Sequence, residues 1–172
     1  MKKNNLPIDC VLAITYHCNS RCTMCDIWKM KDFTELPAGE FAKLPSSLLD
    51  INLSGGEPFL RTDLAEIVQI LVKACPKARV VISSNGFATN LIIHQMKEIL
   101  KMKPDIGVAI SIDGIGEMHN ELRGIPGGFD KAMKTVKELQ KLGMTNLRLA
   151  YTLMEKNVTH LSLVYDLSRE LG

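Results

Sequence analysis

The chain alternates short apolar runs with longer segments in which apolar residues recur every three or four positions. The short runs are typical of buried parallel strands and lie at residues 8–14, 49–53, 79–83, 106–112 and 146–153. The longer segments predict helices at residues 63–74, 91–102, 129–143 and 158–171. Asp63 and Glu66 have capping-box spacing at the start of the first helix, and Gly143 is a C-cap candidate for the third. This order predicts an α/β fold of repeated βα units around a parallel sheet.

Three cysteines, Cys18, Cys22 and Cys25, fall within eight residues directly after the first apolar run. No fourth cysteine follows at ligand spacing. An iron–sulfur cube normally takes four thiolates, so a site with three leaves one iron open to a small molecule. Zinc with a histidine ligand is the alternative, although His17 and Cys18 point to opposite faces of an extended chain and no second ligand pair is present. The spacing alone leaves both kinds of site open.

A Gly-Gly-Glu-Pro run follows the second apolar run, at the carboxyl end of a predicted strand. Gly55 and Gly56 let the backbone come close to a ligand, and Glu57 adds a carboxylate suited to holding an ammonium group. Parallel sheets place their sites at the carboxyl ends of strands. The turn and the cysteines at the end of the preceding strand therefore indicate a shared cofactor pocket.

In this order, the motifs resemble those of the radical S-adenosylmethionine (SAM) enzymes, Cys-x3-Cys-x2-Cys followed by Gly-Gly-Glu-Pro. The resemblance covers essentially the whole chain and extends to two later runs and the residues behind them: Ser83-Ser84-Asn85-Gly86, Ser111-Ile112-Asp113-Gly114, Glu117, His119, Arg123, Gly128 and Phe129. The chain is most similar to the branch with sulfatase-maturing enzymes, peptide-modifying maturases and the cyclase of molybdenum cofactor synthesis.

The resemblance implies a [4Fe-4S] cluster on Cys18, Cys22 and Cys25, with SAM bound at the open iron. Cleavage of SAM would give a 5′-deoxyadenosyl radical that abstracts hydrogen from a substrate, either a small molecule or a peptide. A protein such as flavodoxin or ferredoxin would supply the electron.

The same resemblance implies which residues bind SAM. The amino group would lie against Gly55, Gly56 and Glu57, and Arg123 would pair with the carboxylate through its planar fork. The ribose or the polar end of SAM would contact Ser83, Asn85, Ser111 and Asp113. Met24 stands where the family usually has an aromatic residue near the adenine, and its flexible thioether can fill that space.

The family's core is a partial (β/α) barrel of six units, whereas five are found here. Residues 1–172 are therefore expected to be one radical SAM core domain that is incomplete at its carboxyl end. The fifth strand would then be an exposed edge, which favours self-association.

Composition adds several exclusions. With 46% apolar and 23% charged residues, the chain is typical of a soluble globular domain, and no window approaches the ~20 apolar residues of a membrane span. Lys and Arg are scattered and the net charge is +2, so nucleic acid binding is not indicated. An odd number of cysteines, three of them clustered, favours the reducing cytoplasm.

Three other classes of protein stay open at this point. An electron-transfer iron–sulfur protein or a structural zinc domain could use the cysteines, although neither needs the Gly-Gly-Glu-Pro turn. An inactive or regulatory fragment of a radical SAM enzyme would keep all the motifs.

Overall fold

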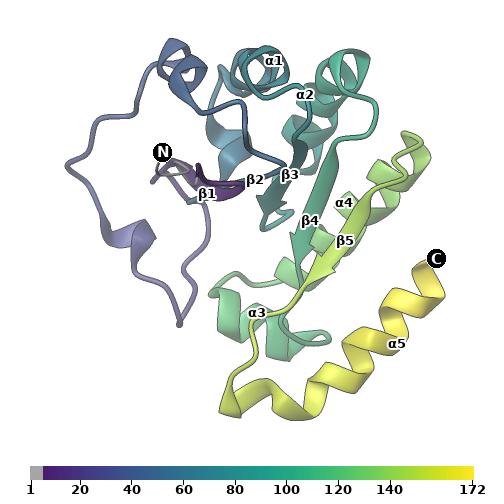
Figure 1. The fold of residues 1–172 in the computed structure, drawn as a ribbon. Helices are drawn as coiled ribbons and strands as arrows, with labels where there is room; N and C mark the ends of the chain where they lie inside the picture. Colours follow the sequence, from purple (N-terminus) through teal and green to yellow (C-terminus); the bar gives the residue numbers. More distant parts are fainter. Residues whose placement is uncertain (1–5) are drawn as a thin grey trace.

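The computed structural model describes residues 6–172, and its centre is a five-stranded parallel sheet in the order β1-β2-β3-β4-β5 (Figure 1). Each strand pairs in parallel with the next one along the chain. The strands are β1 Asp9–Thr15, β2 Asp50–Gly55, β3 Arg79–Ser84, β4 Gly107–Ser111 and β5 Leu147–Ala150. The α/β fold predicted from the alternating pattern is confirmed, although β5 is shorter than the apolar run that predicted it.

Helices alternate with the strands as predicted: α1 Leu64–Ala74, α2 Thr89–Met102, α4 Gly128–Lys141 and α5 Leu161–Leu171. A short helix, α3 Glu117–Arg123, and four 3-10 turns were not predicted; the turns are η1 Ile27–Lys29, η2 Ala38–Lys43, η3 Pro58–Leu60 and η4 Glu155–His160. The fourth predicted helix is therefore divided, since η4 occupies its first turn.

The capping box predicted at the start of α1 is wrong. Asp63 does occupy the N-cap position, but its side chain caps no backbone amide. Its carboxylate instead accepts two hydrogen bonds from the guanidinium of Arg61, at 2.7 and 2.6 Å. The same guanidinium donates to the carbonyl oxygen of Ile14 at 2.6 Å, so this pair ties the start of α1 to the end of β1.

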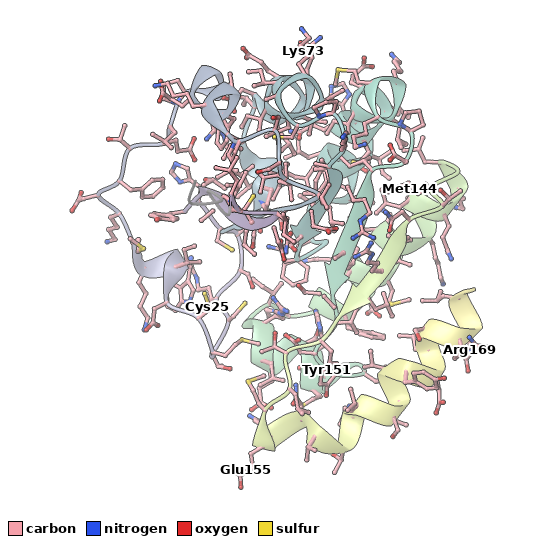
Figure 2. The ribbon with its side chains drawn as sticks, viewed as in Figure 1. Cys25, Lys73, Met144, Tyr151, Glu155 and Arg169 are labelled. Carbon is pink, nitrogen blue, oxygen red and sulfur yellow. The ribbon has the colours of Figure 1, made fainter. Side chains whose placement is uncertain are left out.

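The core lies between one face of the sheet and the helices. Alternate strand residues such as Leu53, Ile82 and Ile110 are fully buried against apolar residues of α1, α2 and α4. Side chains fill this layer densely, whereas α5 exposes much of its surface and contributes only Val164 and Leu171 to the core (Figure 2). On the opposite face of the sheet, the residues near the carboxyl ends of the strands are small and polar.

The sheet is not closed, as expected of a partial barrel. Its two outermost strands, β1 and β5, each pair with one neighbour among residues 6–172. Within the same residues, no helix has the length and apolar character needed to cross a membrane.

Candidate functional site

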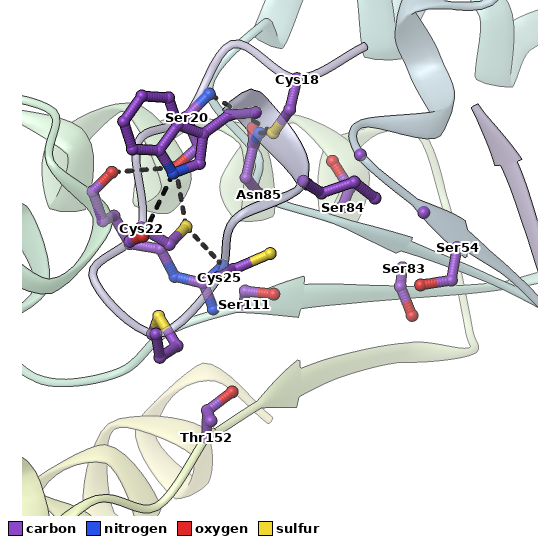
Figure 3. A pocket seen from close by; sticks show the side chains of 16 residues that line it. Cys18, Ser20, Cys22, Cys25, Ser54, Ser83, Ser84, Asn85, Ser111 and Thr152 are labelled. Atoms are coloured by element: carbon purple, nitrogen blue, oxygen red, sulfur yellow. Dashed lines mark hydrogen bonds between the residues drawn. The ribbon is translucent and has the colours of Figure 1, made fainter. Parts of the chain in front are cut away.

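A cavity of about 280 Å3 lies at the carboxyl ends of the strands (Figure 3). It separates the sheet from the loop that carries Cys18, Cys22 and Cys25, called the cysteine loop below. Ten of the twelve residues predicted for the site line it: Cys18, Cys22, Met24, Cys25, Gly55, Gly56, Ser83, Asn85, Ser111 and Arg123. Glu57 and Asp113 do not line it. The fold therefore brings the separate motifs together around one space.

Close backbone contact holds the first part of the cysteine loop against the Gly-Gly turn. The amides of Gly56 and Glu57 donate to the carbonyl oxygens of Thr15 and His17, both at 2.8 Å. A Cβ atom on Gly56 would lie 2.1 Å from the His17 oxygen, and one on Gly55 would lie 2.2 Å from the Thr15 oxygen. Only glycine fits these two positions, because any side chain would push the cysteine loop off the sheet.

The other end of the cysteine loop is held by the last turn of α3. The amides of Arg21 and Thr23 donate to the carbonyl oxygens of Arg123 and Leu122, at 3.0 and 2.8 Å. The last carbonyl oxygens of a helix have no partner within it, so the two loop amides supply hydrogen bonds that the end of α3 would otherwise lack. Gly124 follows with a φ of +65°, and a Cβ there would lie 2.6 Å from the Arg21 oxygen.

The cysteine sulfurs lie among hydrogen-bond donors. The Ser20 amide donates to Cys18 Sγ at 3.4 Å, and Arg123 Nη1 lies 3.7 Å from Cys22 Sγ. Asn85 Nδ2 lies 3.9 Å from Cys18 Sγ and donates to Asn19 Oδ1 at 2.7 Å. Such donors favour sulfur that carries negative charge.

These surroundings fit a group held by several thiolates. Burial raises the pKa of the Cys18 thiol, so a bound cation is needed to keep its sulfur ionised near neutral pH. Within residues 6–172, no three ligating side chains converge as a single metal ion requires. The three thiols instead line a cavity that is larger than the space around one metal ion. An iron–sulfur cluster is a group of this kind, since each thiolate binds a different iron.

Glu57 differs from its prediction, because its carboxylate is turned into the protein and not toward the cavity. It is fully buried and accepts hydrogen bonds from the amides of Phe59 and Asn85, at 3.2 and 2.7 Å, and from Ser84 Oγ at 2.9 Å. Burial raises the pKa of Glu57 to about 7, against the opposing effect of these donors. The side chain therefore fixes the β3–α2 turn that presents Asn85 and is not free for an ammonium group.

Asp113 also differs from its prediction. It is fully buried, and its Oδ1 accepts a hydrogen bond from the Thr152 amide at 2.8 Å. Its Oδ2 lies 2.6 Å from Arg123 Nε, an ion pair whose atoms are not aligned as a hydrogen bond. The amide of Asp113 donates to Nδ1 of buried His119 at 3.1 Å. Asp113 therefore positions Arg123 and does not face a ribose in the cavity.

The amino-acid sequence matches a family model described as the radical SAM superfamily over residues 12–160. The chain belongs to the radical SAM superfamily. This family's cofactors are a [4Fe-4S] cluster and SAM, and its members are enzymes. The match spans the cysteine loop, the Gly-Gly turn and the sheet from residue 12 of β1 onward, which confirms the resemblance inferred from the motifs.

Two curated relatives come from the predicted branches of the radical SAM superfamily. The sporulation killing factor maturation protein SkfB of Bacillus subtilis is 32% identical, over 97% of this chain and 41% of SkfB. A probable GTP 3′,8-cyclase of Sulfurisphaera tokodaii is 26% identical, over 95% of this chain and 53% of the cyclase. The chain thus spans about half or less of these relatives.

A solved structure shares the fold. Streptococcus suis SuiB bound to S-adenosylmethionine superposes with a TM-score of 0.79 at 18% identity, over 96% of this chain and 39% of SuiB.

Within the radical SAM fold, Arg123 is largely buried and paired with Asp113. Its side chain is 12% exposed, with one edge against Asp113 and Nη1 toward Cys22. Trp28 lies nearby and donates to the Cys22 carbonyl oxygen at 3.3 Å. The Ser83 hydroxyl donates to Asn52 Oδ1 at 2.9 Å, whereas Ser111 lines the cavity from β4.

Six lining residues lie outside the twelve predicted for the site: Ser20, Ile27, Trp28, Ser54, Ser84 and Thr152. Two of them could have been found from strand periodicity. Ser54 and Thr152 point to the same face of the sheet as Ser83 and Ser111, because alternate residues of a strand share a face. Ser20 lies in the spacer between two cysteines, and no local pattern distinguishes it.

Proposed function

We propose that this chain binds a [4Fe-4S] cluster through Cys18, Cys22 and Cys25 and binds SAM beside it. The observation that carries the proposal is the common cavity, which the three thiols share with the Gly-Gly turn and Arg123. When bound, the cluster would supply the electron that breaks the C5′–S bond of SAM, leaving methionine and a 5′-deoxyadenosyl radical that would remove hydrogen from the substrate.

The Gly-Gly turn suits the amino group of SAM through its backbone. The amides of Gly56 and Glu57 already donate to the cysteine loop, and the Glu57 carbonyl oxygen accepts from the Leu60 amide, so we assign the carbonyl oxygens of Gly55 and Gly56 to the ligand. Carbonyl oxygens accept hydrogen bonds, as an ammonium group requires. The absence of side chains at Gly55 and Gly56 lets the ligand approach these oxygens.

Arg123 suits the carboxylate of SAM. Asp113 holds the Nε edge of the guanidinium, which leaves part of the planar fork for the cavity. Asn85, Ser83 and Ser111 supply polar groups along the same wall, and we assign them to the ribose or the polar end of SAM. Met24 and Trp28 give the cavity its apolar surface beside the cysteines, where the adenine would pack.

We further propose a peptide as the substrate class. SkfB is named a maturation protein, and SuiB has been solved bound to its precursor peptide SuiA. A flavodoxin or ferredoxin would supply the electron. Five free cysteines support a reducing compartment, the cytoplasm, as the place of action.

Anaerobic reconstitution with iron and sulfide tests the binding part of this proposal. The expected product is a protein with about four irons, and its reduced form should give an electron paramagnetic resonance (EPR) spectrum that changes when SAM is added. A matched sample of the Cys22→Ala variant should lack this spectrum. A bound cluster whose EPR spectrum does not change when SAM is added would contradict the open coordination site. Bound zinc in place of iron after anaerobic purification would contradict the cluster itself.

A further inference from the structure

Ser20 joins a cysteine ligand to the end of α3. Only 1% of its surface is exposed. Its Oγ donates to the carbonyl oxygen of Arg123 at 2.9 Å and lies 3.0 Å from Cys22 Sγ. The contact with Cys22 is the shortest that any polar group makes with a cysteine sulfur among residues 6–172.

The Ser20 hydroxyl has one hydrogen and two acceptors within reach. While Cys22 is a neutral thiol, its S–H can donate to Ser20 Oγ and the hydroxyl can donate to the Arg123 oxygen. A cysteine that binds iron loses its proton, so its sulfur is then an acceptor only. The hydroxyl can turn toward that sulfur, because the Arg123 oxygen keeps the hydrogen bond from the Arg21 amide at 3.0 Å.

We propose that Ser20 donates a hydrogen bond to the Cys22 sulfur in the cluster-bound protein and thereby raises the reduction potential of the cluster. This inference rests on the proposed function. Reduction transfers one electron from an external reductant to the cluster and moves no proton. Part of the added negative charge falls on the thiolate sulfurs, and a donor at 3.0 Å stabilises it.

The experiment compares the midpoint potentials of reconstituted wild-type and Ser20→Ala proteins in a redox titration followed by EPR. Ser20→Ala is expected to keep its iron and to lower the equilibrium constant for reduction by about tenfold, which is about 59 mV for a one-electron couple. Thr23→Ala is the matched control. Thr23 belongs to the same loop, and its Oγ1 donates to the Leu122 oxygen at 3.4 Å without contacting a sulfur.

Each outcome bears on the role of Ser20. If Ser20→Ala has the wild-type midpoint potential, the proposed role of Ser20 is overturned. An equal shift in Thr23→Ala would also overturn it, because the shift would then come from the hydrogen bonds that join the loop to α3. If Ser20→Ala loses its iron, the midpoint potential of Ser20→Thr, which keeps a hydroxyl, is measured in its place. The wild-type potential in Ser20→Thr supports the hydroxyl's role, and a changed potential or lost iron overturns it. A wild-type chain that binds no cluster would instead overturn the proposed function.

Discussion

Glu57 makes a contribution to stability that depends on pH and can be worked out from the structure. Burial is the main cause that raises its pKa from the ordinary 4.5 to about 7. Between these values the folded chain keeps a proton that the unfolded chain has lost. The contribution is therefore fully present below pH 4.5 and is lost as the pH rises through about 7. The difference between 4.5 and about 7 corresponds to about 3 kcal/mol.

Glu57→Gln removes the titration and keeps the side chain's shape. The assay is the free energy of unfolding of both proteins from urea denaturation, between pH 4.5 and about 8. The stability of the wild type relative to Glu57→Gln is predicted to fall by about 3 kcal/mol across this range. A constant difference would refute the reasoning, because Glu57 would then titrate alike in both states.

His119 has the opposite effect in the same range. Burial and the nearby Arg123 lower the pKa of His119 from 6.5 to about 4, so its contribution is lost as the pH falls. Both proteins contain His119, and the comparison between them cancels its effect.

The remaining predictions concern the cysteine loop and the sheet edge. Cys22→Ala should abolish cluster uptake and SAM cleavage, whereas Cys10→Ala on β1 should retain both; iron analysis and product chromatography test this. Gly124→Ala should destabilise the fold and reduce cluster content more than Gly127→Ala in thermal unfolding and iron analysis. Both glycines have a φ of +65°, but a Cβ on Gly127 meets nothing within 4 Å. The larger effect of Gly124→Ala would therefore measure the clash with the Arg21 carbonyl oxygen, and equal effects of the two variants would show that this clash has no consequence. Light scattering at micromolar concentrations should show self-association, which we expect at the exposed edge of β5, and a clean monomer would count against it.

The sheet could be predicted because buried parallel strands have a strong local pattern. Ile82 and Ile110, for example, lie in apolar runs that fit strands buried by helices. The error at Asp63 shows the limit of local rules. Its carboxylate was expected to cap α1, but the Arg61 guanidinium beside it makes two charge-assisted hydrogen bonds that outcompete one backbone amide.

The site was predictable in its members but not in the direction of its side chains. Motif position places Glu57 after a strand, yet only the tertiary structure shows that its carboxylate turns inward to the β3–α2 turn. The contact between Ser20 and Arg123 spans 103 positions, so no local pattern could predict it. The buried pairing of Asp113 with Arg123 likewise depends on how α3 packs over the ends of the strands.

Formation of 5′-deoxyadenosine tests the central claim most directly. After anaerobic reconstitution, the chain is incubated with SAM and a strong reductant, and the products are separated by chromatography. We predict 5′-deoxyadenosine in the wild type and none in Cys22→Ala, because the three thiols and the SAM-binding wall share one cavity. A wild-type chain that holds its cluster and SAM but forms no 5′-deoxyadenosine would contradict the claim that this cavity carries radical SAM chemistry.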